Sequence, residues 1–401
     1  MSRGRQELVG WCAALAVAAA SLAALDYHVR DPDSVLYAEI GRQLAAQPVS
    51  RWIAPTWPDG WYMSGPFLEH PAGLFLLPAV LTRLGYPGAQ ASFVAAALYQ
   101  AMGLVLIPVA ARAFAEGAEA RALGFLLQLL PIAFTFRIRA NHEPAVLLFF
   151  VLALCGIERV GKRRRAGFIV ACAGLLGLML VKGLLVLPAL LCCALWIAVG
   201  NLGGDDGESR ASREWLALAG AVLVLAAAAA AYDGLYRSVT GQSFVSGYLG
   251  RSLSVGSTEG HAWTAGTIPV NAVFYAGRVL WFSFPWSLAL AAAAWVWARR
   301  TPRDLSPSAR GLLFSVGVAM LYIALFSLST RRAERYIFPA YFVVGAAGAV
   351  AAIRRSARLR ALVTKVEGIG PLAPPLLWLV LFGLHLAGAG LPLPHIQIWN
   401  P

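Results

Sequence analysis

The side chains of this sequence that could do chemistry are, first, three acids that closely follow an apolar segment. Asp31, Asp33 and Glu39 come soon after the apolar stretch 8–25. Unpaired acids are costly at the edge of a membrane. Three together therefore indicate either a functional site or the capped start of an interfacial helix whose acids are solvated. Carboxylates suit proton abstraction from a hydroxyl, or support of a cationic sugar centre.

The second group consists of polar residues in the first long loop and in short turns between later apolar segments. These residues are Glu69, His70, Arg137, Arg139, His142, Glu143, Lys182, Arg331, Arg332 and Arg335. Arginine binds phosphate through paired hydrogen bonds, and lysine adds a point charge. Acids and phosphate-binding cations at one membrane surface favour transfer of a group from a lipid phosphate.

Each of these residues also has a plainer interpretation. Arg137 and Arg139 could bind lipid headgroups, and Lys182 could be an interfacial turn residue. Glu143 precedes Pro144 and could simply begin a helix. The acid-histidine dipeptides at 69–70 and 142–143 could hold a divalent metal. No cofactor is predicted with certainty, and a divalent metal stays an alternative.

The composition indicates a polytopic, all-α membrane protein. Of 401 residues, 59% are hydrophobic and 13% are charged, which is too apolar for a soluble chain of this size. The net charge of +13 resides largely in short loops, as membrane orientation requires, so nucleic-acid binding is not expected. No nucleotide-binding glycine pattern occurs, which disfavours ATP-driven transport and a cytoplasmic nucleotide-sugar site.

About eleven membrane spans are expected. They are 8–25, 90–112, 120–136, 144–158, 167–181, 184–200, 214–235, 271–297, 311–328, 336–353 and 372–389. Residues 167–200 would form a helix of about 50 Å if unbroken, so a tight turn is expected at Lys182-Gly183. The shorter apolar piece 72–84 contains Pro78 and is expected to lie in the interface or re-enter.

The distribution of basic residues supports this topology. If 72–84 does not cross, 20 of the 33 lysines and arginines fall on one side, which would be the cytoplasmic side. Lys182 and the polar turns then face outward. Residues 1–353 would form the catalytic module with an outer loop at 26–89, and residues 354–401 a basic cytoplasmic loop and a last span.

Two features of the first outer loop could shape a site. Residues 34–47 place Val35, Leu36, Ile40 and Leu44 at helical spacing, which predicts an amphipathic helix that holds Asp33 at its start. The loop aromatics could lie at the interface, or could stack on a sugar and cover the site. These aromatics are Trp52, Trp57, Trp61 and Tyr62.

Five short motifs, in order, resemble those of the GT-C superfamily of membrane glycosyltransferases. The resemblance is nearest to the branch of protein O-mannosyltransferases and the lipid A aminoarabinose transferase. The motifs cover residues 8 to about 340, and Ser34 and His70 depart from the family pattern by replacing an acid and a lysine. The matching segments are Asp33-Ser34-Val35-Leu36-Tyr37-Ala38-Glu39, Glu69-His70-Pro71, Arg139-Ala140-Asn141-His142-Glu143-Pro144, Lys182-Gly183 and Arg335-Tyr336-Ile337-Phe338-Pro339.

This resemblance implies an inverting glycosyltransferase with a polyprenyl-phosphate sugar donor. Asp33 and Glu143 would be catalytic. Substrate would be bound by Tyr37, Glu69, His70, Arg137, Arg139, His142, Lys182, Arg331, Arg332, Arg335 and Tyr336. The expected partners are membrane lipids and an envelope lipid, glycan or protein acceptor. The expected location is a bacterial inner membrane, with the site facing the periplasm or exterior. The alternative is a multi-pass transporter of lipids or small molecules.

Overall fold

A computed structural model describes residues 32–61, 63–115, 117–127, 130–133, 141–202, 207–258, 266–299, 306–329 and 332–367. These residues are helical apart from loops and one isolated bridge between Thr56 and Pro66, so the all-α prediction is confirmed. The α-helices are α2 (Pro32–Ala46), α3 (Gly73–Arg83), α4 (Gly88–Ala111), α5 (Gly117–Leu126), α7 (Glu143–Val160), α8 (Arg164–Lys182), α9 (Val186–Gly200), α10 (Gly207–Thr240), α11 (Phe244–Thr258), α12 (Thr267–Phe282), α13 (Trp286–Ala298), α14 (Pro307–Ser327), α15 (Phe338–Arg355) and α16 (Ala357–Glu367). Short 3₁₀ helices are η1 (Val49–Arg51), η3 (Gly183–Leu185) and η4 (Glu334–Ile337).

Several of these helices could cross a membrane. Within the described ranges, five helical runs are long and apolar enough by length and composition, with Arg164–Gly200 counted as one run, or six if the bent pair α12–α13 counts as one span. The expected spans 8–25 and 372–389 lie outside the described residues, as does part of 120–136. The count of eleven spans is therefore not confirmed, although the membrane-protein class is.

The stretch 271–297, expected as one span, is not a single straight helix. Helices α12 and α13 meet at an angle of 108°. Pro285 lies at the break, and proline has no N–H with which to continue a helix. Two serine hydroxyls satisfy carbonyls around it: Ser283 donates to the carbonyl of Tyr341 at 3.0 Å, and Ser287 donates to that of Leu280 at 2.6 Å.

The helical run Arg164–Gly200 folds back on itself. It contains 37 residues and would be about 55 Å long if straight. Instead, the residues before and after the run contact the same ion pair of α10, in which Arg210 Nε lies 2.8 Å from Glu214 Oε1. Glu158, before the run, contacts Arg210 at 3.3 Å, and Asn201, after it, donates to Glu214 at 3.1 Å. The chain therefore reverses between α8 and α9, as the sequence predicts.

Gly183 makes this reversal possible. Its φ of +54° lies in a region that side chains other than glycine rarely adopt, and a Cβ there would stand 2.5 Å from Tyr248 Oη. That hydroxyl donates to the carbonyl of Lys182 at 3.3 Å and accepts from the N–H of Leu184 at 3.1 Å. The turn is thus tied to α11 through a tyrosine that leaves no room for a methyl group.

Gly183→Ala is expected to destabilise the protein clearly. The strained backbone alone costs about 1–3 kcal/mol, and displacement of Tyr248 would break its two bonds to the turn. We expect a thermal unfolding midpoint in detergent several degrees below wild type. Gly250→Ala, on α11 with no atom within 4 Å of the added Cβ, should leave the midpoint unchanged or slightly raised. Equal midpoints for both variants would contradict this account of the turn.

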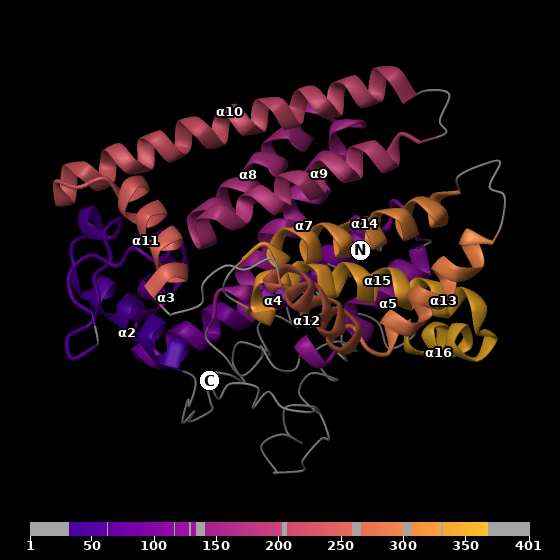
Figure 1. Ribbon diagram of the computed structural model, residues 1–401, viewed down its shortest axis with the longest axis horizontal. Helices are drawn as coiled ribbons and strands as arrows, with labels where there is room; N and C mark the ends of the chain where they lie inside the picture. Colours follow the sequence, from indigo (N-terminus) through magenta and orange to yellow (C-terminus); the bar gives the residue numbers. More distant parts are fainter. Residues whose placement is uncertain are drawn as a thin grey trace, which may run out of the picture.

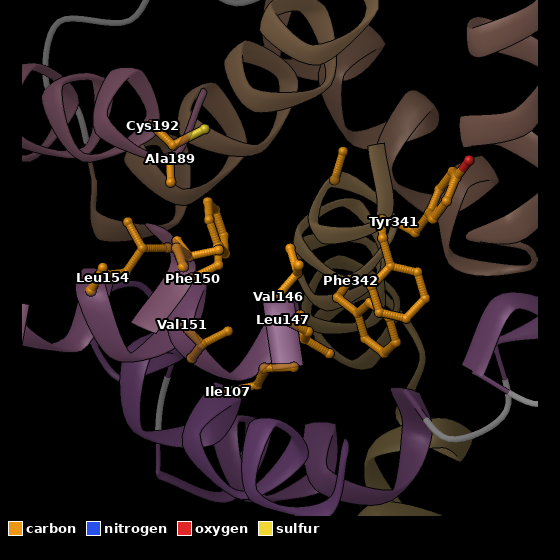
Figure 2. Packing of buried hydrophobic residues seen from close by; sticks show 14 of the residues in the cluster. Ile107, Val146, Leu147, Phe150, Val151, Leu154, Ala189, Cys192, Tyr341 and Phe342 are labelled. Carbon is orange, nitrogen blue, oxygen red and sulfur yellow. The ribbon is translucent and has the colours of Figure 1, made fainter. Parts of the chain in front are cut away.

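The core is built around α7. Figure 2 shows side chains of α7 meeting those of α4, α9 and α15. The labelled residues there are Ile107, Val146, Leu147, Phe150, Val151, Leu154, Ala189, Cys192, Tyr341 and Phe342. Glycines allow α8 to lie close against α7: a Cβ on Gly156 would meet Ala171, and one on Gly174 would meet Ala153. This rigid packing fixes where α7 and α8 begin and end, and so where their terminal polar residues lie.

The segment before α4 packs as a small helical layer. Leu36, Ile40 and Leu44 of α2 are buried as predicted, but Val35 is 45% exposed and Tyr37 takes its place in the core. Residues 36, 37, 40 and 44 lie on one helical stripe, whereas Val35 is a further 100° away. The short helix expected at 72–84 is confirmed as α3, which at 11 residues is too short to span.

The two ends of the molecule differ in character. In Figure 1, α2, α3 and α11 gather at one end of the long axis and α16 lies near the other. At the α16 end, Arg354 pairs with Glu119 at 2.7 Å. The basic segment that follows α15 is helical over 357–367, and Val363 is buried. The candidate site lies at the α2 end.

Candidate functional site

Asp33 and Arg335 form an ion pair although 302 positions separate them in the sequence. Asp33 lies in the first turn of α2, where the helix dipole favours an acid. Arg335 lies in η4, directly before α15. Burial opposes ionisation of Asp33, but the charge and hydrogen bond of Arg335 outweigh it and lower the pKa of Asp33 below its usual value. Asp33 is therefore held as a carboxylate.

Lys182, the last residue of α8, lies between two histidines. Its Nζ is 3.1 Å from His70 Nε2 and 3.3 Å from His142 Nδ1. Burial lowers the pKa of both imidazoles well below the usual value, and the Lys182 charge acts in the same direction. Both rings are therefore neutral. Burial and the charge of Arg335 lower the pKa of Lys182 to about 7, and in its protonated form this amine donates to one nitrogen of each ring.

His142 and Glu143 form a second layer at the start of α7. His142 Nε2 lies 2.7 Å from Glu143 Oε1, and the two side chains are 1% and 0% exposed. Neither carboxylate oxygen receives an aligned hydrogen bond from the described residues. Burial raises the pKa of Glu143 to about 7, although the charges of Lys182 and Arg335 oppose the shift. Asn141 Oδ1 accepts from the N–H of His142 at 2.8 Å and orders this helix start.

Tyr37 connects α2 to the histidines. Its hydroxyl lies 3.0 Å from His70 Nε2, and its ring packs edge-on against Phe75 of α3. Burial, helped by the charge of Asp33, raises the pKa of this tyrosine well above its usual value. Tyr37 is thus a neutral hydrogen-bonding group that positions His70.

A further ion pair closes the site from α11. Arg251 Nη2 lies 2.9 Å from Glu69 Oε1, and the guanidinium stands over the ring of Trp57 at 5.6 Å. Sequence reasoning missed Arg251 and Tyr248. The available signal was their spacing of three residues on one face of a helix in the outer loop 236–270.

These groups surround one cavity of about 720 Å³. One wall is polar, and the other is apolar and formed by η3, α9 and α14. The lining residues are Pro32, Asp33, Leu36, Tyr37, Trp61, Glu69, His70, Lys182, Leu184, Leu185, Leu187, Pro188, Leu191, Tyr248, Arg251, Leu325, Phe326, Ser329, Arg335 and Tyr336. Such a cavity could hold an anionic head beside an extended hydrocarbon chain.

The structure brings most of the predicted site residues together. Seven of them line the cavity: Asp33, Tyr37, Glu69, His70, Lys182, Arg335 and Tyr336. His142 and Glu143 are buried beside it and do not line it, and Arg332 is exposed and does not line it either. Predicted residues Arg137, Arg139 and Arg331 lie outside the described residues, as do Asp31 and Tyr62.

Of the loop tryptophans that the structure describes, only Trp61 lines the cavity. Trp52 and Trp57 are buried, with exposed fractions of 8% and 5%. Arg83 stands over the Trp52 ring at 4.7 Å. Stacking on a sugar therefore remains a prediction for Trp61, whereas Trp52 and Trp57 are packing residues.

The arrangement of the two histidines does not suit a metal. In the described part of the chain, no group of three or more His, Cys, Asp or Glu side chains is placed to hold an ion. His70 and His142 instead direct one nitrogen each at the Lys182 ammonium. That cation occupies the lone pairs that a metal would need.

The fold has known counterparts among solved structures. No protein-family model and no curated protein matches the chain. Two solved structures of ArnT from Cupriavidus metallidurans resemble it. The structure bound to undecaprenyl phosphate has a TM-score of 0.65 and the apo structure 0.58, each at 19% identity. Both matches cover 92% of this chain and 63% of ArnT, so the chain spans less than two thirds of that protein.

Proposed function

We propose that this chain, whose fold is that of the GT-C transferase ArnT, is an inverting glycosyltransferase that uses a polyprenyl-phosphate sugar. The observation that carries the proposal is the convergence of Asp33, Lys182 and Arg335 on one cavity with an apolar wall. The donor would place its phosphate at the cations and its sugar toward Asp33. The acceptor would be an envelope lipid, glycan or protein.

The phosphate of the donor would be bound by Lys182 and Arg335, with Arg139 as a further candidate. Guanidinium and ammonium groups stabilise phosphate oxygens, most strongly where water is excluded. They also stabilise the charge that builds on the phosphate as it leaves, so no general acid is needed for departure. ArnT in complex with undecaprenyl phosphate supports a lipid of this class as the ligand.

The prenyl chain of the donor would follow the apolar wall of the cavity. Leu187, Pro188 and Leu191 of α9 line the cavity together with Leu325 and Phe326 of α14. Leu187 and Leu191 are 53% and 45% exposed, so apolar surface is available for a hydrocarbon chain. Burial of each methylene there would contribute about 0.8 kcal/mol.

Asp33 would act as the general base. The acceptor oxygen attacks the anomeric carbon, the bond from that carbon to the phosphate oxygen breaks, and the acceptor proton passes to Asp33. The configuration inverts, and polyprenyl phosphate is released. If the acceptor is already an anion, Asp33 would orient it instead. Glu143, which the family resemblance implied to be catalytic, is fully buried beside the cavity, so we assign it a supporting role through His142.

A transporter of lipids or small molecules is the alternative. In the structure, Asp33, Lys182, His142 and Arg335 lie at the beginnings or ends of their helices. Transporter sites are usually found near the middle of the membrane. The location of these groups at helix ends therefore favours a transferase, and the topology predicted from the basic residues would place its site toward the periplasm or exterior.

An assay without compartments separates the two functions. Purified protein in detergent would be mixed with a radiolabelled polyprenyl-phosphate sugar and an envelope lipid extract. A transferase should release polyprenyl phosphate and label an acceptor, at a rate that depends on Asp33. Tight binding of the lipid, without release of polyprenyl phosphate in the presence of any acceptor, would favour the transporter and overturn the proposal.

A further inference from the structure

Among the residues that the structure describes, the hydrogen-bond partners of the Lys182 amine are two neutral imidazoles, although the site also contains acids. An ammonium group has three N–H donors. Two of them point at His70 Nε2 and His142 Nδ1, at 3.1 and 3.3 Å. Lys182 also lines the cavity, and its side chain is 8% exposed. The third donor is therefore the one that can meet a ligand.

The acids around Lys182 are each in contact with another group. Asp33 pairs with Arg335, Glu69 pairs with Arg251, and Glu143 contacts His142. A carboxylate beside Lys182 would neutralise its charge and compete with an anionic ligand. Two neutral imidazoles instead fix the position of the Lys182 amine and add no charge that competes with the ligand. Burial lowers the pKa of Lys182 to about 7, so an anionic ligand beside it would favour the charged ammonium.

The contacts also show which nitrogen of each ring faces Lys182 and accepts from it when the lysine is protonated. His142 presents Nδ1 to Lys182 and Nε2 to Glu143, while His70 presents Nε2 to both Lys182 and Tyr37. The two rings therefore support one cation through different atoms. A role in packing alone would not depend on which nitrogen of each ring faces Lys182.

We propose that His70 and His142 are positioning residues that hold Lys182 as an un-neutralised donor with one N–H directed at a phosphate oxygen of the ligand. The inference deepens the proposed function, since it assumes that the ligand carries a phosphate. Glu143 and Tyr37 orient the two rings. Neither histidine is itself a base in the reaction.

Crossed amide substitutions test this assignment. A Gln amide reaches the position of Nε2 and an Asn amide that of Nδ1. His70→Gln and His142→Asn thus keep an acceptor for Lys182, whereas His70→Asn and His142→Gln remove it. His70→Glu keeps the acceptor and the shape of His70→Gln but adds a negative charge.

The measurement is the Kd of undecaprenyl phosphate in detergent, together with the thermal unfolding midpoint of each variant. His70→Gln and His142→Asn should bind within about 3-fold of wild type. His70→Asn, His142→Gln and His70→Glu should bind about 10-fold more weakly or worse, the effect expected from loss of one hydrogen bond to a charged group. Midpoints within each pair should agree.

Two outcomes would overturn the inference. Equal affinities for the Asn and Gln variants at each position would mean that the acceptor atom is irrelevant. Binding by His70→Glu as tight as that by His70→Gln would mean that the charge of Lys182 need not be free. Failure of wild-type protein to bind the lipid would instead remove the proposed function, so the two failures are distinguishable.

Discussion

Asp33→Asn is expected to lower turnover by about 10²–10⁴-fold, the usual contribution of a general base, while undecaprenyl phosphate still binds. The amide cannot take the acceptor proton. It also releases Arg335 from its ion pair, so the guanidinium becomes more available to the phosphate. Affinity for the lipid should therefore be unchanged or higher. The check is turnover of a polyprenyl-phosphate sugar beside the Kd of undecaprenyl phosphate.

The matched control for this variant is Glu39→Gln. Glu39 is an acid on the same helix whose pair with Arg42 is exposed to solvent, and such pairs contribute little. The Glu39→Gln variant should retain activity near wild type. An Asp33→Asn protein that turns over at more than about a tenth of the wild-type rate would exclude Asp33 as the base for a hydroxyl acceptor.

Much of the fold could be predicted from the sequence because its signals are local. Apolar length and hydrophobic period identified α2, α3 and α14, and the excess length of 167–200 predicted the reversal at Gly183. The bend between α12 and α13 was missed because their apolar run is continuous. A proline near its middle was the only local indication, and its effect depends on serines that reach carbonyls of other turns.

The site could be predicted less completely, because its contacts are not local. Residue type and order near helix ends selected Asp33, Lys182 and Arg335, and the structure brings them to one cavity. Residue type could not reveal that Asp33 would pair with Arg335 or that the two histidines would flank Lys182. Arg251 was missed because its one local signal, the spacing of three residues from Tyr248, does not show which part of the protein that helix face contacts. Only the packing of α11 against the first loop, through Arg251 and Glu69, brings it to the site.

Arg335→Gln is expected to weaken binding of undecaprenyl phosphate and to change the pH dependence of turnover. Loss of a charged hydrogen bond costs about 1.5–3 kcal/mol, or about 10- to 150-fold in Kd. The second effect concerns Asp33, whose pKa is raised by burial and lowered by Arg335, with a net lowering. Without the guanidinium, burial dominates and the pKa rises.

A base must be ionised, so activity is lost as the pH falls through the pKa of Asp33. In wild type this acid limb of the kcat/KM profile should lie below the usual range for aspartate, and in Arg335→Gln it should move to higher pH. Arg335→Lys keeps the charge, so it should weaken lipid binding while leaving the limb low. Arg237→Gln, which breaks an exposed pair with Asp233, should alter neither. If the limb stays in place in Arg335→Gln, then Asp33 is not the group that titrates, and the ion pair serves only to shape the cavity.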